Sequence, residues 1–255
     1  MEKSTVIGLI LGFVAVGVGM VFKGASLTFL LNPAAFLIIF VGTAATLFIG
    51  FPMKEISKFP VLLGIIMKGQ KHETEEELIR IFTDFAGTAR KSGLLSLEGR
   101  MDEVHNPYMR KGLSLIIDGR DPEFVQNILQ EDISAMEERH QMGAQIFTQA
   151  GTYAPTLGVL GAVIGLVAAL GNLNDIEKLG HSIAAAFIAT LMGIFSGYVL
   201  WHPFANKLKR FSKHEAELKK MIFEGITALQ AGDSASTVEE KLNVFLPQKK
   251  REKPE

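Results

Sequence analysis

The sequence predicts an all-α integral membrane protein with four transmembrane helices, a helical cytoplasmic insert between the second and third, and a C-terminal cytoplasmic helix. Residues 24–53 and 141–174 contain no Asp, Glu, Lys or Arg, whereas the neighbouring segments are densely charged. This alternation is typical of membrane spans and water-facing regions. Residues 151–203 also hold two apolar runs joined by a short polar turn. Each run has roughly the 20 residues that cross a bilayer, so these two helices are expected to lie antiparallel.

The first span is predicted over Thr5–Phe22. A secretory signal peptide would have a shorter apolar core, a more basic beginning and a small-residue cleavage site, so we expect this span to be retained. Gly8 and Gly12 form a GxxxG pattern within it. Such spacing allows close approach of helix backbones in lipid, and we predict that both glycines serve helix packing.

The second span is predicted over Pro33–Phe51, with Asn32 as its cap and proline at its first position. Basic residues follow the second and fourth spans: Lys54, Lys58, Lys207, Lys209, Arg210 and Lys213. Basic residues favour the cytoplasmic side of a membrane. We therefore expect both termini and the insert in the cytoplasm, with the chain crossing the membrane four times.

The insert is predicted to be helical because its apolar residues recur at three- and four-residue spacing. One apolar face comprises Leu78, Ile81, Phe82, Phe85 and Ala89, and a later one comprises Phe124, Ile128, Leu129, Ile133 and Met136. Gly93 suits a helix end, Ser96 a restart, and Asp121 the cap of a helix that begins at Pro122.

The third and fourth spans are predicted over Gly151–Gly171 and Leu179–Trp201. Both are rich in small residues at helical spacing: Gly158, Gly161, Gly165, Gly193 and Gly197. In lipid, helices associate through close packing of such residues. Ordinary packing explains any single GxxxG, but several together indicate a tightly packed bundle or oligomer.

Beyond the fourth span, a helix is expected to continue into the cytoplasm, to break at 231–236, and to be followed by a short helix. The long helix has an apolar face of Leu208, Phe211, Leu218, Met221, Ile222, Gly225 and Leu229, and the short one points Val238, Leu242 and Phe245 inward. The expected segments are spans at 1–53, a helical domain at 54–150, spans at 151–203, C-terminal helices at 204–246 and a disordered tail at 247–255.

The sequence contains no catalytic constellation and no metal-binding spacing, so we expect neither an enzyme nor a cofactor. The absence of cysteine excludes thiol chemistry and disulfides. A net charge of −1 argues against nucleic acid as a partner. The apolar runs also lack any carboxylate. If the protein uses an ion gradient, another subunit must supply the titrating acid, and this chain supplies small residues and hydroxyls such as Thr190.

Taken together, the segments TYAPTLGVLGAVIGLVAAL, HSIAAAFIATLMGIFSGYVLWHPFANKLK and ALQAGDSASTVEEKLNVFLP resemble the third span, fourth span and C-terminal signature of the MotA/PomA family, stator subunits of the bacterial flagellar motor. The resemblance covers nearly the whole chain. It implies a homo-oligomer, five-fold in this family, that surrounds the spans of two MotB-like, peptidoglycan-binding chains that carry the membrane acid. Membrane lipid would surround the assembly.

The same resemblance assigns roles to particular residues. Arg90 and Glu98 match charges that contact the rotor protein FliG and transmit torque. Pro155 and Pro203 match prolines that couple protonation of the partner's acid to the cytoplasmic domain. From spacing alone, both pairs would be ordinary: two solvated charges and two helix-terminal prolines.

The resemblance also bears on the coupling ion. Sodium-driven relatives place Thr where this chain has Ala162, and often a second Thr where it has Ala189 beside Thr190. A hydroxyl oxygen can replace part of the water shell of sodium, and an alanine cannot. We therefore expect H+ rather than Na+ as the coupling ion.

Two other functions compete with the stator interpretation. An ExbB/TolQ-like energiser of envelope transport would use a similar ion ring, but the long insert and the C-terminal signature count against it. A substrate transporter would have internal repeats and polar sites at mid-membrane, and the sequence has neither.

Overall fold

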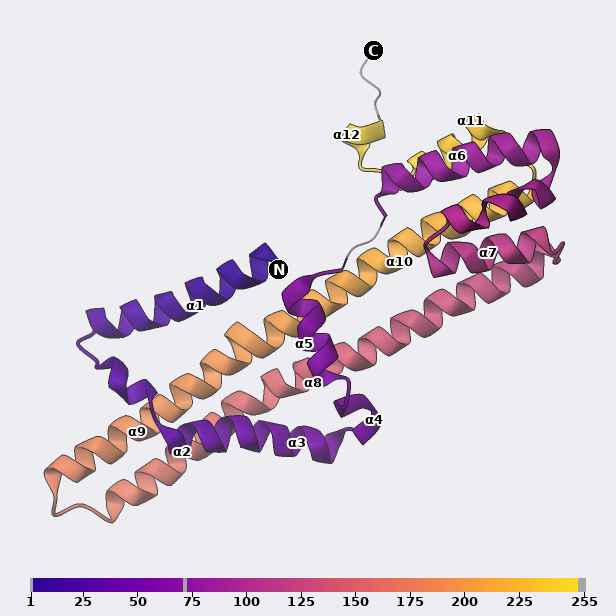
Figure 1. The fold of residues 1–255 in the computed structure, drawn as a ribbon. Helices are drawn as coiled ribbons and strands as arrows, with labels where there is room; N and C mark the ends of the chain where they lie inside the picture. Colours follow the sequence, from indigo (N-terminus) through magenta and orange to yellow (C-terminus); the bar gives the residue numbers. More distant parts are fainter. Residues whose placement is uncertain (1, 71–72, 252–255) are drawn as a thin grey trace. The chain divides into compact units, whose positions relative to one another are not determined.

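The computed structural model describes residues 2–70 and 73–251. Throughout that part of the chain the regular elements are helical and no strand occurs (Figure 1), so the predicted all-α class is confirmed. Two compact units can be distinguished. The apolar unit comprises Met1–Gln70 with His140–Arg210, and the charged unit comprises Lys71–Arg139 with Phe211–Glu255.

This division differs from the expected segments, whose boundaries lie after residues 53, 150 and 203. Those boundaries mark where helices would leave a membrane, whereas the two units mark which residues pack together. The expected membrane boundaries therefore stay predictions.

The apolar unit contains the following elements, in chain order: α1 (Lys3–Phe22), the 3-10 turn η1 (Leu27–Leu30), α2 (Pro33–Phe36), the π turn η2 (Leu37–Val41), α3 (Gly42–Gly50), α4 (Met53–Ile56), α5 (Phe59–Lys68), the C-terminal part of α8 (Pro122–Leu170), α9 (Ile176–Phe195), the π turn η4 (Ser196–Trp201) and the start of α10 (His202–Gln230).

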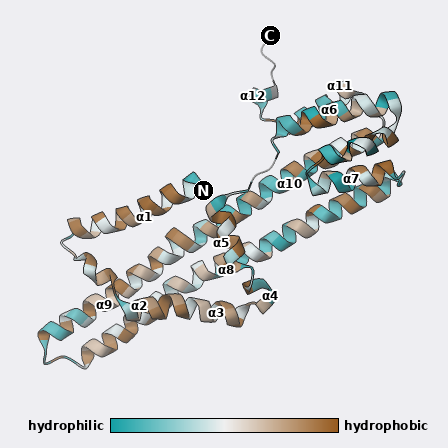
Figure 2. Ribbon diagram, in the orientation of Figure 1, coloured by the Kyte–Doolittle hydropathy of each residue, from teal (hydrophilic) through white to brown (hydrophobic). Residues whose placement is uncertain are grey.

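Four helical stretches among the described residues are long and apolar enough to cross a membrane (Figure 2): Lys3–Phe22, Leu27–Gly50, Pro122–Leu170 and Ile176–Gln230. The third was expected over Gly151–Gly171, but this run is only the end of a 49-residue helix. Hydropathy identifies only the apolar part of a helix and not its charged continuation. The charged residues before it keep the helical period, so backbone hydrogen bonding continues through them. The fourth stretch continues far beyond its apolar run, as predicted.

The second span begins as the sequence indicates and is then locally distorted. Asn32 caps it, because its Oδ1 accepts a hydrogen bond from the N–H of Ala35 at 3.1 Å, and Pro33 is its first residue. The π turn η2 then replaces the expected regular helix and buries Ile39 completely. No sequence feature signalled this turn.

Lys207, near the start of α10, holds the N-terminal end of α1. Its Nζ donates to Ser4 Oγ at 2.9 Å and to Thr5 Oγ1 at 2.5 Å, and it lies 3.4 Å from a carboxylate oxygen of Glu2. Thr5 in turn donates to the Ile66 carbonyl on α5 at 3.2 Å. Hydrogen bonds from Ser4, followed by the charge of Lys207, lower the pKa of Glu2. A lysine expected only as a topology signal thus joins α10 to α1, and Thr5 continues the connection to α5.

The charged unit is built from α6 (Glu75–Ser92), the 3-10 segment η3 (Leu94–Glu103), α7 (Pro107–Ile117), the N-terminal part of α8, the C-terminal part of α10, and α11 (Ala235–Asn243). Helix α10 ends at Gln230 and α11 begins at Ala235, so the predicted break is confirmed at 231–234, while residues 235–236 of the predicted segment already belong to α11.

The core of the charged unit confirms most predicted apolar faces. Its buried members include Leu78, Phe82, Phe85, Leu129, Ile133, Met136, Leu218, Met221, Ile222, Leu229, Val238 and Leu242. Two predictions were wrong. Phe124 is 46% exposed and lies under the Arg120 guanidinium, while the neighbouring Val125 is buried. Phe245 is likewise exposed and Leu246 is buried in its place. Neighbouring residues on a helix point about 100° apart. Because positions 124 and 125, and likewise 245 and 246, are both apolar, the sequence does not show which of each pair faces the core.

Of the three helix-end residues predicted in this unit, two are confirmed and one is wrong. Gly93 ends α6 with φ at +80°, a conformation that glycine adopts readily. Asp121 caps α8, since its carboxylate accepts from the N–H of Glu123 at 3.1 Å. Ser96 was predicted to cap a helix, but its hydroxyl donates to the Gly93 carbonyl at 2.6 Å within η3.

Arg100 fixes η3 against α6. Its guanidinium lies 2.6 Å from both Asp84 and Glu103 and sits over the ring of Phe85. Hydrogen bonds to Glu103 and then Asp84 raise the pKa of Arg100, and the same arginine lowers the pKa of Glu103. The segment that carries Glu98 is therefore held by charge-assisted hydrogen bonds as well as by its buried Leu97.

Asp132 on α8 joins α7 and α10. One carboxylate oxygen accepts from Lys111 at 3.0 Å and the other from Lys219 at 2.9 Å. Burial raises the pKa of Asp132, but the hydrogen bonds from the two lysines outweigh it, so the pKa is lowered overall. This carboxylate therefore stabilises the fold in its ionised form.

Replacing Asp132 with Asn should destabilise the protein by about 1–3 kcal/mol at neutral pH, because the partly buried ammonium group of Lys219 and the exposed one of Lys111 lose their charged acceptor. A carboxylate whose pKa is lowered by folding contributes its stability above its unfolded pKa of about 3.9 and loses it as the pH falls through the folded value. D132N should thus also lose less stability on acidification below about pH 4 than the wild type. Thermal unfolding of the detergent-purified protein against pH tests both effects.

Asp102→Asn is the control for this measurement, because the Asp102 side chain is fully exposed and its nearest cation is 3.6 Å away. The stability of D102N should differ little from that of the wild type at any pH. Wild-type stability of D132N at pH 7 would contradict the role given to this network.

The segment 247–255 was expected to be disordered, and this expectation does not describe all of it. Residues Gln248–Arg251 form a helical turn, α12, and Lys250 Nζ lies 2.5 Å from a carboxylate oxygen of Glu76. Residues 252–255 of the expected tail lie outside the described residues.

Candidate functional site

Helices α8 and α9 meet at glycines in almost direct backbone contact. A Cβ placed on Gly193 would lie 2.7 Å from Gly158 Cα and 2.8 Å from the Ala154 carbonyl oxygen. A Cβ on Gly158 would lie 2.8 Å from the Ala189 carbonyl oxygen. No side chain fits at either position without separating the helices. Glycine at both positions is therefore required for this close approach.

The contact continues along both helices through small residues. A Cβ on Gly161 would come within 3.1 Å of Ala189 Cβ, and one on Gly165 within 2.9 Å of Ala186 Cβ. Alanines 154, 186 and 189 belong to this interface but were missed in the sequence. Their signal was present, because they extend the same small-residue spacing, although the sequence does not show which alanines face the partner helix.

The two glycines of α1 differ in their surroundings. A Cβ on Gly12 would meet Val199 Cγ1 at 2.6 Å, so this glycine packs as predicted. A Cβ on Gly8 would meet no atom within 4 Å, so Gly8 contacts no other helix of the same chain and its predicted packing role stays a prediction. Gly8 and Gly12 lie about 40° apart around a helix axis, and the sequence does not show which of them faces a neighbour.

Pro155 lies inside α8, opposite Gly197. Proline has no N–H, so the usual helical hydrogen bond to the Gly151 carbonyl is missing. A Cβ on Gly197 would lie 2.7 Å from the Pro155 ring and 2.8 Å from that same Gly151 oxygen. The proline is therefore not the helix terminus that spacing alone would suggest. It is an interior defect packed against a glycine.

Gly197 belongs to the π turn η4, which ends at Trp201, two residues before Pro203. The His202 N–H donates to the Gly197 carbonyl, five residues back, instead of to the usual residue four back. A proline ring clashes with the carbonyl four residues earlier in a regular helix, and the wider π register relieves that clash. Such turns are common at functional sites. The structure thus places Pro155, Gly197 and η4 together, with exposed Pro203 just beyond.

Ala162 and Thr190 are half-buried, on α8 and α9 respectively. Ala162 follows Gly161 in the interface, and Thr190 follows Ala189, which contacts that glycine. Beside them α8 exposes a continuous set of large apolar side chains: Val159, Leu160, Val163, Ile164, Leu166 and Val167. In this part of the chain the nearest acids, Asp175 and Glu177, lie in and just after the turn between the two spans.

Arg90 and Glu98 lie in the charged unit, on α6 and η3, and both side chains are exposed. Within the described part of the chain, neither belongs to a salt bridge, in contrast to Arg100. Two free charges on a segment fixed from within can contact another protein without loss of internal structure. The same part of the chain contains no group of three or more His, Cys, Asp or Glu side chains that could hold a metal ion.

These features define a class of protein: a helical membrane subunit whose third and fourth spans pair through glycine and hold no Asp or Glu in their apolar runs. Residues 100–221 match the model of the MotA/TolQ/ExbB proton channel family, and residues 6–93 match that of the motility protein A N-terminal region. The chain is 53% identical to motility protein A of Bacillus subtilis, over 98% of this chain and 93% of that protein. It is 32% identical to the chemotaxis protein PomA of Vibrio alginolyticus, over 98% of each.

Solved structures agree with these sequence matches. The fold matches a chain of the flagellar MotAB stator complex from Bacillus subtilis with a TM-score of 0.94 and 53% identity, covering 98% of both chains. It matches a chain of C. jejuni MotAB with a TM-score of 0.92, 29% identity and 97% coverage of both. The chain belongs to the motility protein A family, and it is a stator subunit of the bacterial flagellar motor. The ExbB/TolQ alternative is not favoured.

Proposed function

We propose that this stator subunit forms an ion pathway together with a single-span partner of the MotB type. The observation that supports this most directly is that the apolar runs of α8 and α9 pack through Gly158 and Gly193 and contain no Asp or Glu. An ion path through hydrocarbon needs a group that can bind and release the ion. A partner helix against the apolar wall of α8 would supply that acid, and several copies of this chain, five by analogy with the family, would surround it.

The two proline positions provide the coupling step in this proposal. When the partner's acid loses its charge by binding an ion, the neighbouring helices face a different charge. The α8–α9 contact can respond at Pro155 and η4, where regular hydrogen bonding is already interrupted and bending costs least. One charge crossing about 100 mV supplies about 2.3 kcal/mol, which can shift a local equilibrium but cannot unfold a domain.

The charged unit would transmit this motion to the rotor protein FliG through Arg90 and Glu98. Exposed ion pairs contribute only about 0.2–1 kcal/mol and are screened by salt. Such contacts form and break readily, as a stepping contact must. In this arrangement the chain is a multi-pass protein of the bacterial inner membrane, with both termini and the charged unit in the cytoplasm.

Co-purification tests the proposed assembly. The chain is expressed with a one-span, peptidoglycan-binding protein from the same genome and isolated through a tag on the partner. We expect a stable complex with more copies of this chain than of the partner, five to two if the family arrangement holds. Native mass spectrometry counts the chains. Recovery of this chain as a monomer, or proton conduction by this chain purified without the partner, would refute the proposal.

Proton coupling is the second part of the proposal, and it rests on Ala162 and Ala189, where sodium-type relatives carry hydroxyls. Swimming should therefore continue when sodium is replaced by potassium at a constant proton gradient, and it should stop when a protonophore collapses that gradient. Swimming speed measured in both media checks this. Arrest on sodium withdrawal would assign the motor to sodium.

A further inference from the structure

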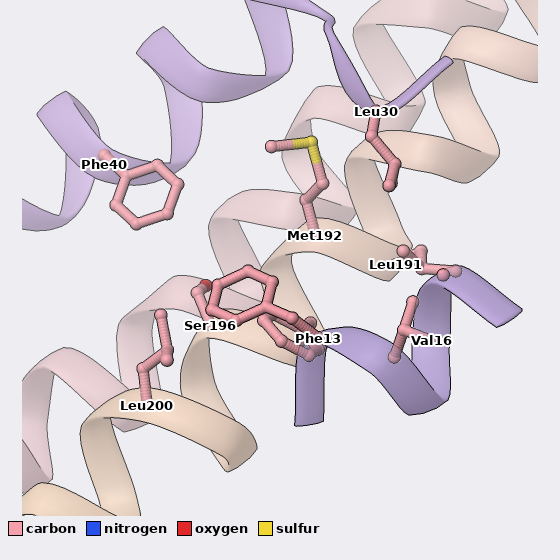
Figure 3. Close-up of a pocket in the computed structure, with 10 residues that line it drawn as sticks. Phe13, Val16, Leu30, Phe40, Leu191, Met192, Ser196 and Leu200 are labelled. Atoms are coloured by element: carbon pink, nitrogen blue, oxygen red, sulfur yellow. The ribbon is translucent and has the colours of Figure 1, made fainter. Parts of the chain in front are cut away.

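An apolar pocket lies in the apolar unit between three spans (Figure 3). Its volume is about 200 Å3, and it is lined by side chains of α1, η1, η2, α9 and η4. Phe13 and Val16 face it from α1, Phe40 from η2, and Leu191 and Met192 from α9. The rings of Phe13 and Phe195, both of which line the pocket, have their centroids 4.9 Å apart. Neither the ion pathway nor the rotor contact uses this pocket.

Water does not suit this pocket. Ser196 is its one hydroxyl-bearing residue, and that hydroxyl donates to the Gly193 carbonyl at 3.0 Å. A buried water needs two to four polar partners, and apolar cavities of about 150 Å3 stay dry and bind hydrocarbons. An empty pocket of this size would forfeit the dispersion contacts of its lining. The pocket therefore favours an apolar occupant.

The position and size of the pocket indicate which occupant. Phe13 and Val16 lie near the middle of α1, and Phe40 lies near the middle of the second span. At that depth a membrane offers hydrocarbon tails and no headgroups. A helix of a second copy is about 10–12 Å wide with its side chains and cannot enter. We propose that this pocket is a binding site for one acyl chain of a membrane phospholipid, held between α1 and the π turn η4.

Val16→Phe tests the proposal because the added ring would fill the pocket. Val14→Phe is the matched control: it adds the same volume to the same helix at a position that is 51% exposed and does not line the pocket. The intact complex is washed extensively in mild detergent, and the retained phospholipid is counted by mass spectrometry. The wild type and V14F should retain about one phospholipid per chain more than V16F. Equal retention in all three would overturn the proposal.

A labelling experiment keeps the test valid if V16F assembles poorly. Wild-type complex in vesicles is irradiated with a phosphatidylcholine that carries a diazirine on its acyl chain. Adducts should concentrate on the partly buried lining residues Val16, Leu191, Met192 and Leu200. If adducts form only at outward positions such as Ile7 and Ile10, which are more than half exposed, the pocket holds no lipid. Unlabelled pocket peptides together with a smaller V16F assembly would assign the pocket to a side chain of another copy and would also overturn the proposal.

Discussion

Replacing Gly193 with Ala should strongly lower the free energy of unfolding of the protein and abolish motility. The new Cβ would lie within 3 Å of backbone atoms of Gly158 and Ala154. Backbone atoms cannot change rotamer, so α8 and α9 must move apart along their contact. We expect the free energy of unfolding to fall by an amount at the upper end of the roughly 1–3 kcal/mol that overpacking of a core costs. Thermal unfolding in detergent measures stability, and tracking of swimming cells measures function.

Gly180→Ala is the control within the same helix. A Cβ on Gly180 would meet no atom within 4 Å, and alanine favours a helix over glycine by about 0.8–1 kcal/mol. This variant should be as stable as the wild type or more so, and it should swim. If G193A matched G180A in both measurements, the contact between α8 and α9 would not have the importance assigned to it.

Replacing Arg90 with Glu should remove most swimming while leaving folding and membrane assembly intact. Arg90 is exposed and belongs to none of the described salt bridges, so its loss should change stability by no more than about 0.5 kcal/mol. In the proposed rotor contact, however, the reversed charge would meet the acidic partner of this arginine with repulsion instead of attraction. Swimming speed and the amount of complex in the membrane are measured together.

Two further variants separate the rotor contact from general charge effects. Lys220→Glu makes the same reversal at an exposed position of α10 and should swim normally. Arg100→Glu should lower stability, because Arg100 binds Asp84 and Glu103 within the fold. Normal swimming of R90E, or an equal defect in K220E, would remove the torque role from Arg90.

Much of the fold followed from local patterns. Asn32 and Asp121 were recognisable as caps, and Gly93 as a helix end, because these features depend on a few neighbouring residues. The apolar face of α6 followed from its period. The same reasoning failed at Phe124 and Phe245, where an apolar neighbour one position away could occupy the core equally well. Only the other packed helices decide such a choice.

The candidate site was predictable as a set of residue types and less so as an arrangement. Repeated glycines in two uncharged runs indicated a close helix pair, and the structure pairs Gly158 with Gly193 as that pattern implies. The sequence did not indicate that Pro155 packs on Gly197, that η4 is a π turn, or that Lys207 holds the beginning of α1. Each of these depends on an atom of a distant segment.

The sequence by itself determined that this protein is helical, that it has four apolar runs of membrane-spanning length, and that these runs hold no Asp or Glu. Those properties depend on composition and on periods that any stretch of chain carries with it. Only the tertiary structure decided which glycines touch, where the helical hydrogen bonds are interrupted, and that an apolar pocket remains between the spans. These features arise from contacts between residues far apart in the chain, and a local pattern cannot specify the shape of the surface it will meet.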